Sequence, residues 1–175
     1  MADRVETFIG WLTHDVADDR AVRASLRRGL GQPPGYAPEM LMHMAPRTQG
    51  MKAWEERAAY IIAPLFALHP MNTSSGNMGD HLRRLRGKND EALERRFGVL
   101  LAAHEEELDV YLRQAITMLK QQETPVNWLQ LFGDINAWSH PDGQARVRRA
   151  WANSFYRRAA PEATDNEPSD STNGE

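Results

Sequence analysis

The chain has 175 residues, of which 41% are hydrophobic and 26% charged, with a formal net charge of −3 and no cysteine. This composition indicates a soluble globular protein of one domain, and the missing cysteines exclude disulfides, thiolate chemistry and cysteine-ligated zinc. No apolar run approaches the roughly 20 residues of a membrane span. Since the first residues also lack a basic segment followed by an apolar one, we expect a cytoplasmic protein.

Apolar residues recur at three- and four-residue spacing, which predicts helices along most of the chain. Asp18 or Asp19 should cap the second helix and Gly29 should end it, and the glycines and prolines of 29–37 indicate a loop. Pro64 should kink the fourth helix or end its regular part early. The first half is expected to contain helices at 5–12, 20–28, 38–44 and 52–68.

The second half continues the helical pattern. Asn89 or Asp90 is expected to cap one helix, and Pro125 and Pro141 suit the first turns of two others. The expected helices are 79–86, 91–103, 105–122, 124–138 and 141–158. The alternation at 40–44 could also form a strand, but it has no partner strand. We therefore predict an all-α, single-domain bundle of about eight helices over residues 1–160.

The last 15 residues differ in composition from the rest. Residues 161–175 contain five acidic residues and no Lys, Arg or aromatic residue, so we predict a disordered acidic tail. Without it the chain has 21 basic and 19 acidic residues, a net charge of +2. The tail could simply be solvated, or it could be an acidic arm that competes with nucleic acid for a basic surface.

The sequence offers no convincing catalytic or metal site. No two of the six histidines are three or four residues apart, so each is expected in a loop or at the surface. Gly29 and Gly31 lack the preceding strand of a phosphate-binding loop. The acidic run 105–107 fits the first turn of a helix better than a catalytic pair. We therefore expect no enzyme activity, no metal, no cofactor and no small-molecule substrate.

Arginine is the remaining signal, because the chain has 18 arginines and three lysines. Arginine suits phosphate geometry, and some basic residues recur in polar rows along helices. One such row is Arg113, Thr117 and Lys120 on the helix expected at 105–122. The five tryptophans could stack on bases, but at helical spacing among leucines, as for Trp54, they are expected in the core. The competing interpretation of the arginines is a solvated face paired with nearby acids. The candidate nucleic-acid-binding residues are Arg27, Arg28, Arg83, Arg84, Arg86, Arg95, Arg96, Arg113, Lys120, Arg146, Arg149 and Arg157.

Several ordered segments resemble one known family. They are Asp18-Asp19-Arg20-Ala21 to Leu26-Arg27-Arg28-Gly29, Leu65-Phe66-Ala67-Leu68-His69-Pro70, Glu94-Arg95-Arg96-Phe97 to Leu100-Leu101, Tyr111-Leu112-Arg113-Gln114 to Met118-Leu119-Lys120, Trp128-Leu129-Gln130-Leu131 to Trp138, and Trp151-Ala152-Asn153-Ser154-Phe155-Tyr156. In this order and spacing, over about residues 5–158, the chain resembles the CasB-type family, the small subunit of the type I-E CRISPR Cascade complex.

This resemblance implies an all-α, non-catalytic subunit that is present in two head-to-tail copies. Such a subunit would contact the backbone and large subunits of Cascade, and would help to hold the guide-RNA–target heteroduplex and the displaced DNA strand. By position, the resemblance favours six of the candidates: Arg27, Arg28, Arg96, Arg113, Lys120 and Arg149. The cluster at 83–88 lies where the family is variable.

Two other functions are compatible with the sequence in principle. A helical protein–protein adaptor could use the same basic faces to contact acidic protein partners. A nuclease or other hydrolase would need clustered carboxylates or histidines around a divalent metal, and the spacing of these residues predicts none.

Overall fold

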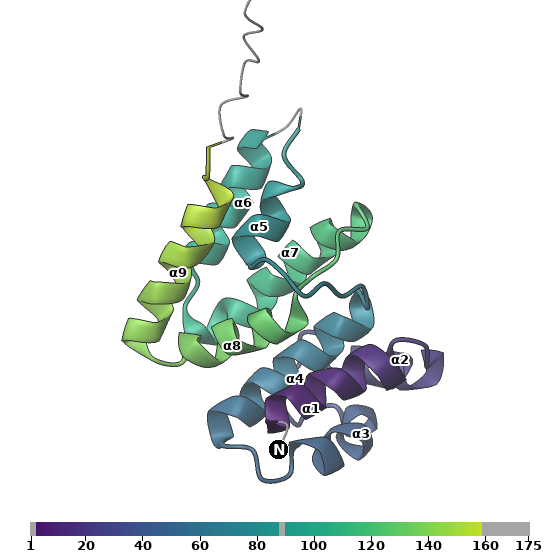
Figure 1. Ribbon diagram of the computed structural model, residues 1–175. Coiled ribbons are helices and arrows are strands. Elements are labelled where there is room, and N and C mark those ends of the chain that lie inside the picture. Colours follow the sequence, from purple (N-terminus) through teal and green to yellow (C-terminus); the bar gives the residue numbers. More distant parts are fainter. Residues whose placement is uncertain (1–2, 88–89, 159–175) are drawn as a thin grey trace, which may run out of the picture.

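The computed structural model describes residues 3–87 and 90–158 and shows an all-α, single-domain fold (Figure 1). The helices of this part are α1 (Arg4–Trp11), α2 (Arg20–Arg27), α3 (Pro38–Thr48), α4 (Ala53–Leu68), α5 (Met78–Arg83), α6 (Asp90–Ala102), α7 (Leu108–Gln121), α8 (Trp128–Trp138) and α9 (Pro141–Phe155). A π-helical turn, Leu12–Val16, extends α1, and a 3₁₀ turn, Glu105–Glu107, precedes α7. The predicted acidic tail lies outside the described residues.

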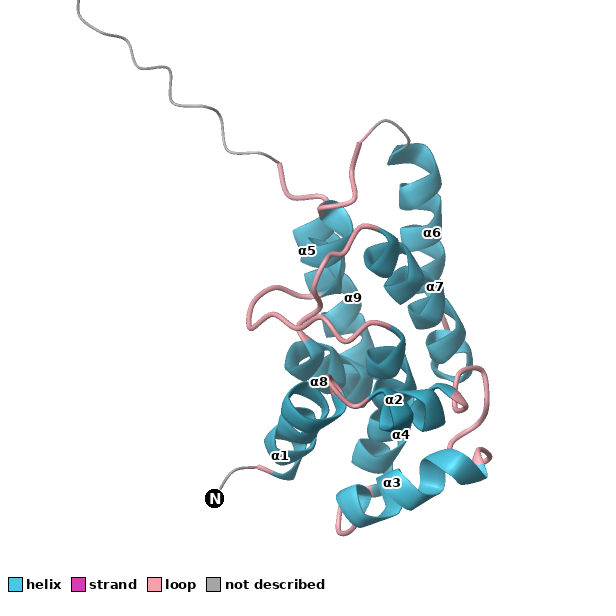
Figure 2. Ribbon diagram, turned by 90° about the vertical axis from the view of Figure 1, so that its right-hand side faces the viewer, coloured by secondary structure: helices cyan, strands magenta, loops and turns pink. Residues whose placement is uncertain are grey.

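The helices form two halves that share one core. Helices α1–α4 occupy one end of the molecule and α5, α6, α7 and α9 the other, with α8 between them (Figures 1 and 2). Large side chains join the halves: the Phe66 ring of α4 meets the Trp128 ring of α8 at 5.5 Å, and Phe8 of α1 lies 6.0 Å from Phe132 of α8. One continuous set of buried side chains therefore runs through the fold.

The first half follows the predicted order, and α3 is longer than predicted. Asp19 caps α2, as expected, because its carboxylate accepts hydrogen bonds from the backbone N–H groups of Ala21 and Val22, both at 2.9 Å. Helix α3 continues past the predicted end at 44 to Thr48, which is buried like Met40 and Met44 on the same helix. Pro64 does not end α4, which runs four residues further. Pro64 and its neighbours are buried, and this burial offsets the lost hydrogen bond.

The start of α8 differs from the prediction. The helix begins at Trp128 rather than 124, and the Asn127 side chain caps it by accepting a hydrogen bond from the backbone N–H of Gln130 at 3.1 Å. The preceding Val126 pairs with a distant segment, because its N–H donates to the carbonyl of Met71 at 3.1 Å. This long-range pairing holds 124–126 out of the helix.

Two predictions about burial were wrong for particular side chains. Trp54 was expected inward, but it is 41% exposed at the start of α4, where it packs against Lys52 and His140. His81 was expected in a loop or at the surface, but it lies on α5 and is 1% exposed. His69 lies in a loop after α4, as expected, but it is only 3% exposed. His69 Nε2 lies 2.7 Å from the carbonyl oxygen of Thr124, and His81 Nε2 accepts from the N–H of Asn127 at 3.0 Å. The other ring nitrogen of His81, Nδ1, is buried and has no hydrogen-bond partner among the described residues.

None of the helices in the described part is long and apolar enough to cross a membrane.

Candidate nucleic-acid interface

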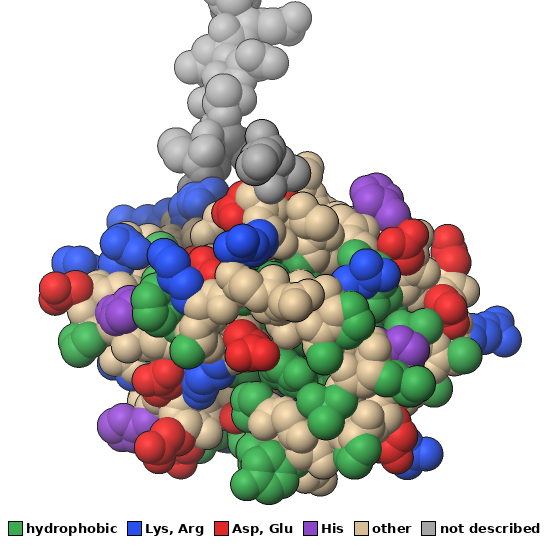
Figure 3. Space-filling model, turned by 90° about the horizontal axis from the view of Figure 1, so that it is seen from below, with side chains coloured by type: hydrophobic (Ala, Val, Ile, Leu, Met, Phe, Trp, Pro, Cys, Tyr) green, Lys and Arg blue, Asp and Glu red, His purple; other side chains and the backbone are tan. Residues whose placement is uncertain are grey.

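The predicted cationic residues are accessible but do not form one surface. Eleven of the twelve are exposed, and Arg83 is half-buried. On the face at the α3 end, basic side chains are interspersed with acidic and hydrophobic ones (Figure 3). The structure gathers candidates at two places, while Arg27, Arg28, Arg95, Lys120, Arg146 and Arg149 line neither.

The larger group surrounds an open hollow of about 900 Å³ between α5 and the end of α9, which we call the arginine hollow. Three predicted residues of the 83–86 cluster meet Arg157 there, although more than 70 residues separate them in sequence. The hollow is lined by Ser75, Gly76, Asp80, Arg83, Arg84, Arg86, Tyr156, Arg157 and Arg158.

Close packing of α5 on α9 creates this hollow. A Cβ atom at Gly79 would overlap the carbonyl oxygen of Trp151, so only glycine permits the observed approach of the two helices. At the start of α5, the Asn77 side chain accepts from the N–H of Asp80 at 3.2 Å and donates to the hydroxyl of Ser154 at 3.0 Å. Asn77 thus caps α5 and ties it to α9.

Positive charge exceeds negative charge around the hollow. Arg157 pairs with Asp80 at 3.3 Å, and Arg86 donates to Glu94 at 2.6 Å. Within the described residues, Arg83, Arg84 and Arg158 have no carboxylate within ion-pairing distance. Five guanidinium groups are therefore opposed by two carboxylates, which favours an extended anion with several phosphates.

His81 lies beneath this surface on α5 and is not available for acid–base chemistry. The pKa of His81 is lowered from 6.5 to about 4, chiefly by burial and then by the charge of Arg84, while Asp80 opposes the shift. The neutral ring accepts a hydrogen bond from the N–H of Asn127. His81 thus serves to fix α5 against the segment that precedes α8.

A smaller groove lies between α6 and α7 and contains two other predicted residues, Arg96 and Arg113. Arg96 lies 3.3 Å from the sulfur of Met118. In the predicted α7 row, Thr117 also lines the groove, but its hydroxyl donates to the Arg113 carbonyl oxygen at 2.7 Å. Lys120, the third member of that row, does not line the groove, so only part of the row forms a common surface.

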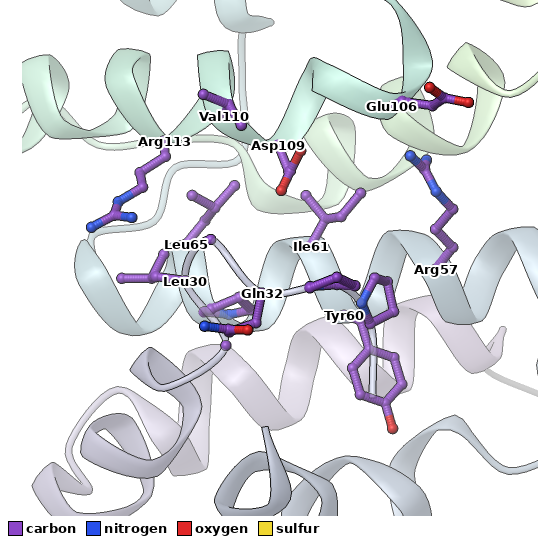
Figure 4. A pocket seen from close by; sticks show the side chains of 15 residues that line it. Leu30, Gln32, Arg57, Tyr60, Ile61, Leu65, Glu106, Asp109, Val110 and Arg113 are labelled. Atoms are coloured by element: carbon purple, nitrogen blue, oxygen red, sulfur yellow. The ribbon is translucent and has the colours of Figure 1, made fainter. Parts of the chain in front are cut away.

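Arg113 also borders a pocket of about 330 Å³ between the loop 29–34, α4 and α7 (Figure 4). Arg113 and Arg57 stand at opposite ends, with Ile61 and Leu65 among the apolar side chains between them and Asp109 on the same wall as Arg113. Arg57 is already paired with Glu105 at 3.3 Å. This mixed lining is less suited to a phosphate chain than the arginine hollow.

Tyr156 and Arg158 line the hollow but were not among the predicted binding residues. Helix α9 was expected to continue to about 158, but it ends at Phe155. The chain leaves the helical path there, and both residues reach the hollow. The adjacency of Arg157 and Arg158 was the only sequence signal for the second arginine.

The described residues contain no group of three or more His, Cys, Asp or Glu side chains that could hold a metal ion.

Comparison with known proteins decides the family. The family model for CRISPR-associated protein Cse2 matches residues 22–156, which is most of the chain. The chain belongs to the Cse2 family. The resemblance to the CasB-type family is thus confirmed, and the Cse2 match contains Arg83, Arg84 and Arg86 of the hollow but ends before Arg157 and Arg158.

Individual Cse2 relatives agree with this assignment. A CRISPR-associated protein Cse2 of Thermus thermophilus is 29% identical over 161 residues, covering 90% of this chain and 92% of that protein. The crystal structure of CasB from Thermus thermophilus has a TM-score of 0.74 at 26% identity, covering 87% of this chain and 97% of that one. A chain of a CRISPR RNA-guided surveillance complex shares the fold, with a TM-score of 0.72 at 24% identity over 88% of this chain and 92% of that one.

Proposed function

We propose that this Cse2-family protein is the non-catalytic small subunit of a type I-E Cascade surveillance complex. In that complex it would bind the backbone of nucleic acid through the arginine hollow. Three facts support the proposal: membership of the family, the fold shared with a chain of a surveillance complex, and the excess of arginine in the hollow. The excess of arginine in the hollow is the main support for the proposal, because a surface that contacts only protein does not require this excess.

The expected mechanism is electrostatic clamping. Guanidinium groups bind phosphate oxygens and release condensed counterions, so affinity should fall as salt rises. Phosphate contacts carry no sequence information, and base pairing with the guide would supply it. The clamp would stabilise the state in which the guide RNA is paired with the target and the other DNA strand is displaced. Its protein partners would be the backbone and large subunits and a second copy placed head to tail.

Charge reversal in the hollow tests the proposal. We expect Arg84→Glu with Arg158→Glu to weaken binding of labelled single-stranded DNA strongly and to reduce the salt dependence, since two cations are lost. The matched control is Arg20→Glu with Arg47→Glu, which makes the same change in charge at exposed positions outside the hollow. Equal loss in both double variants would show that overall charge, and not the hollow, governs binding.

The pocket of Figure 4 favours a second function, that of a protein–protein adaptor. Its apolar lining and charges of both signs suit a side chain of a protein partner better than a phosphate chain. Val110, which is 50% exposed at this pocket, offers a test. Val110→Asp should weaken assembly with the other subunits and leave single-stranded DNA binding unchanged. The adaptor function alone would predict that added single-stranded DNA does not compete for any surface of the protein.

A further inference from the structure

Tyr156 is an exposed aromatic residue at the wall of the arginine hollow. Its residue surface is 50% exposed, and it follows the last residue of α9 directly. Within the described residues, its hydroxyl forms no hydrogen bond, and its backbone N–H donates to the carbonyl of Ala152 at 2.9 Å. The accessible part of Tyr156 therefore adds an aromatic surface to the hollow, and its backbone is held by the end of the helix.

Two buried aromatic rings fix the ring of Tyr156 on its side toward the core. Phe155 meets it edge to face, with the centroids 4.9 Å apart and the planes at 85°, and Phe97 of α6 lies 6.1 Å away. Phe97 and Phe155 stack on each other at 4.1 Å and are fully buried. The core thus fixes the orientation of the Tyr156 ring. Binding of a flat ligand to this ring would therefore cost the protein little additional conformational entropy.

Cations lie directly beside this ring. The guanidinium carbon of Arg86 is 4.6 Å from the Phe155 ring centre and 5.7 Å from that of Tyr156, and Glu94 anchors Arg86. Arg157 and Arg158 follow Tyr156 in the chain and line the same hollow. The hollow therefore combines phosphate-binding groups with an aromatic platform, which is the combination that single-strand binding sites use.

We infer that the arginine hollow takes single-stranded nucleic acid, with one nucleobase stacked on Tyr156. This inference rests on the proposed function and adds to it a residue that binds a base, Tyr156. In a duplex the faces of the bases are covered by their neighbours, so a duplex would contact only the arginines. A displaced strand offers free base faces next to its phosphates. Tyr156 is then the residue that distinguishes single strand from duplex at this site, with little preference among the bases.

The test compares four substitutions at position 156 in the full chain. Tyr156→Leu and Tyr156→Ala remove the aromatic ring, whereas Tyr156→Phe and Tyr156→Trp keep one. We measure binding of a labelled oligothymidine and of a duplex of equal length across a salt series. The Leu and Ala variants should bind the single strand about tenfold more weakly and the duplex as before. The Phe and Trp variants should retain single-strand affinity.

The salt dependence separates stacking from charge. Loss of the ring removes no cation, so the slope of log affinity against log salt should not change. Arg84→Glu with Arg158→Glu removes two cations and should make this slope less steep. Thermal unfolding of each variant shows whether the fold is retained. Unchanged single-strand affinity in a folded Tyr156→Leu variant would overturn the stacking inference alone. If the unaltered protein bound neither substrate at low salt, the proposed function would be overturned with it.

Discussion

At the scale of single residues, His81 makes stability depend on pH. Its folded pKa of about 4 lies below the ordinary 6.5, so folding favours the neutral ring. The associated stability is complete above pH 6.5 and is lost as pH falls toward 4, by on the order of 3 kcal/mol in total. We expect denaturant unfolding at pH 7 and pH 5 to differ in the wild type and to differ much less in His81→Gln. Equal pH dependence in both proteins would contradict the assignment.

Asp134 acts in the opposite direction. Burial raises the pKa of its carboxyl group, although hydrogen bonds from Trp151 and Gln130 and the charge of Arg146 lower it in part. A carboxyl group with a raised pKa gains stability as pH falls through the folded value toward its unfolded one. This gain should offset part of the loss at His81. Unfolding of Asp134→Asn, measured over the same pH range, should therefore show a steeper loss of stability in acid, and an unchanged curve would argue against this role.

At the scale of elements, the contact between α5 and α9 determines the hollow. Ala at position 79 would collide with the Trp151 carbonyl group, and we expect Gly79→Ala to lower the free energy of unfolding by about 1–3 kcal/mol. Single-stranded DNA binding should fall as well, because Arg83 and Arg84 would move away from Arg157. Denaturant unfolding and the DNA-binding assay measure the two effects.

The matched control for this change is on α6. Nothing lies within 4 Å of a Cβ atom at Gly98, so Gly98→Ala should stabilise the protein by up to about 1 kcal/mol through helix propensity and leave DNA binding unchanged. A Gly79→Ala variant as stable as Gly98→Ala would show that the close approach of α5 and α9 is not required.

Helix content could be predicted from the sequence because it depends on local spacing and capping. Asp19 and the buried apolar face of α7 are examples in which neighbouring residues suffice. The start of α8 could not be predicted, since the partner of Val126 is Met71, far along the chain. The burial of His81 depends on a backbone N–H of the segment before α8 for the same reason. These predictions failed because contacts between segments distant in sequence determine both features.

At the scale of the whole molecule, the basic residues could be identified from the sequence, but the residues that lie beside them in space could not. Arg84 and Arg157 gather only because α5 packs on α9, and no local pattern contains that information. Tyr156 and Arg158 were missed because the end of α9 directs them to the hollow. The roles of Arg146 and Arg149, which lie outside the hollow, stay predictions.

The acidic segment 161–175 should weaken nucleic-acid binding by the whole chain. Its removal changes the formal net charge from −3 to +2, and the segment follows soon after Arg158 of the hollow. We expect the 1–160 protein to bind single-stranded DNA several-fold more tightly at low salt, with the difference vanishing at high salt because charge is screened. A full-length variant with the five acids changed to amides should behave like the truncation. Equal affinity of all three proteins would leave the segment without this role.

The most direct test of the central claim uses the assembled complex. Arg84→Glu with Arg158→Glu is introduced into this subunit, complex assembly is verified by size and composition, and binding of a matching DNA target is measured at fixed salt. We predict that the variant complex assembles normally but binds the target more weakly and leaves the displaced strand more accessible to chemical modification. The control, Arg20→Glu with Arg47→Glu, should leave target binding and strand accessibility unchanged. Intact assembly with target binding equal to that of the unaltered complex would contradict the account.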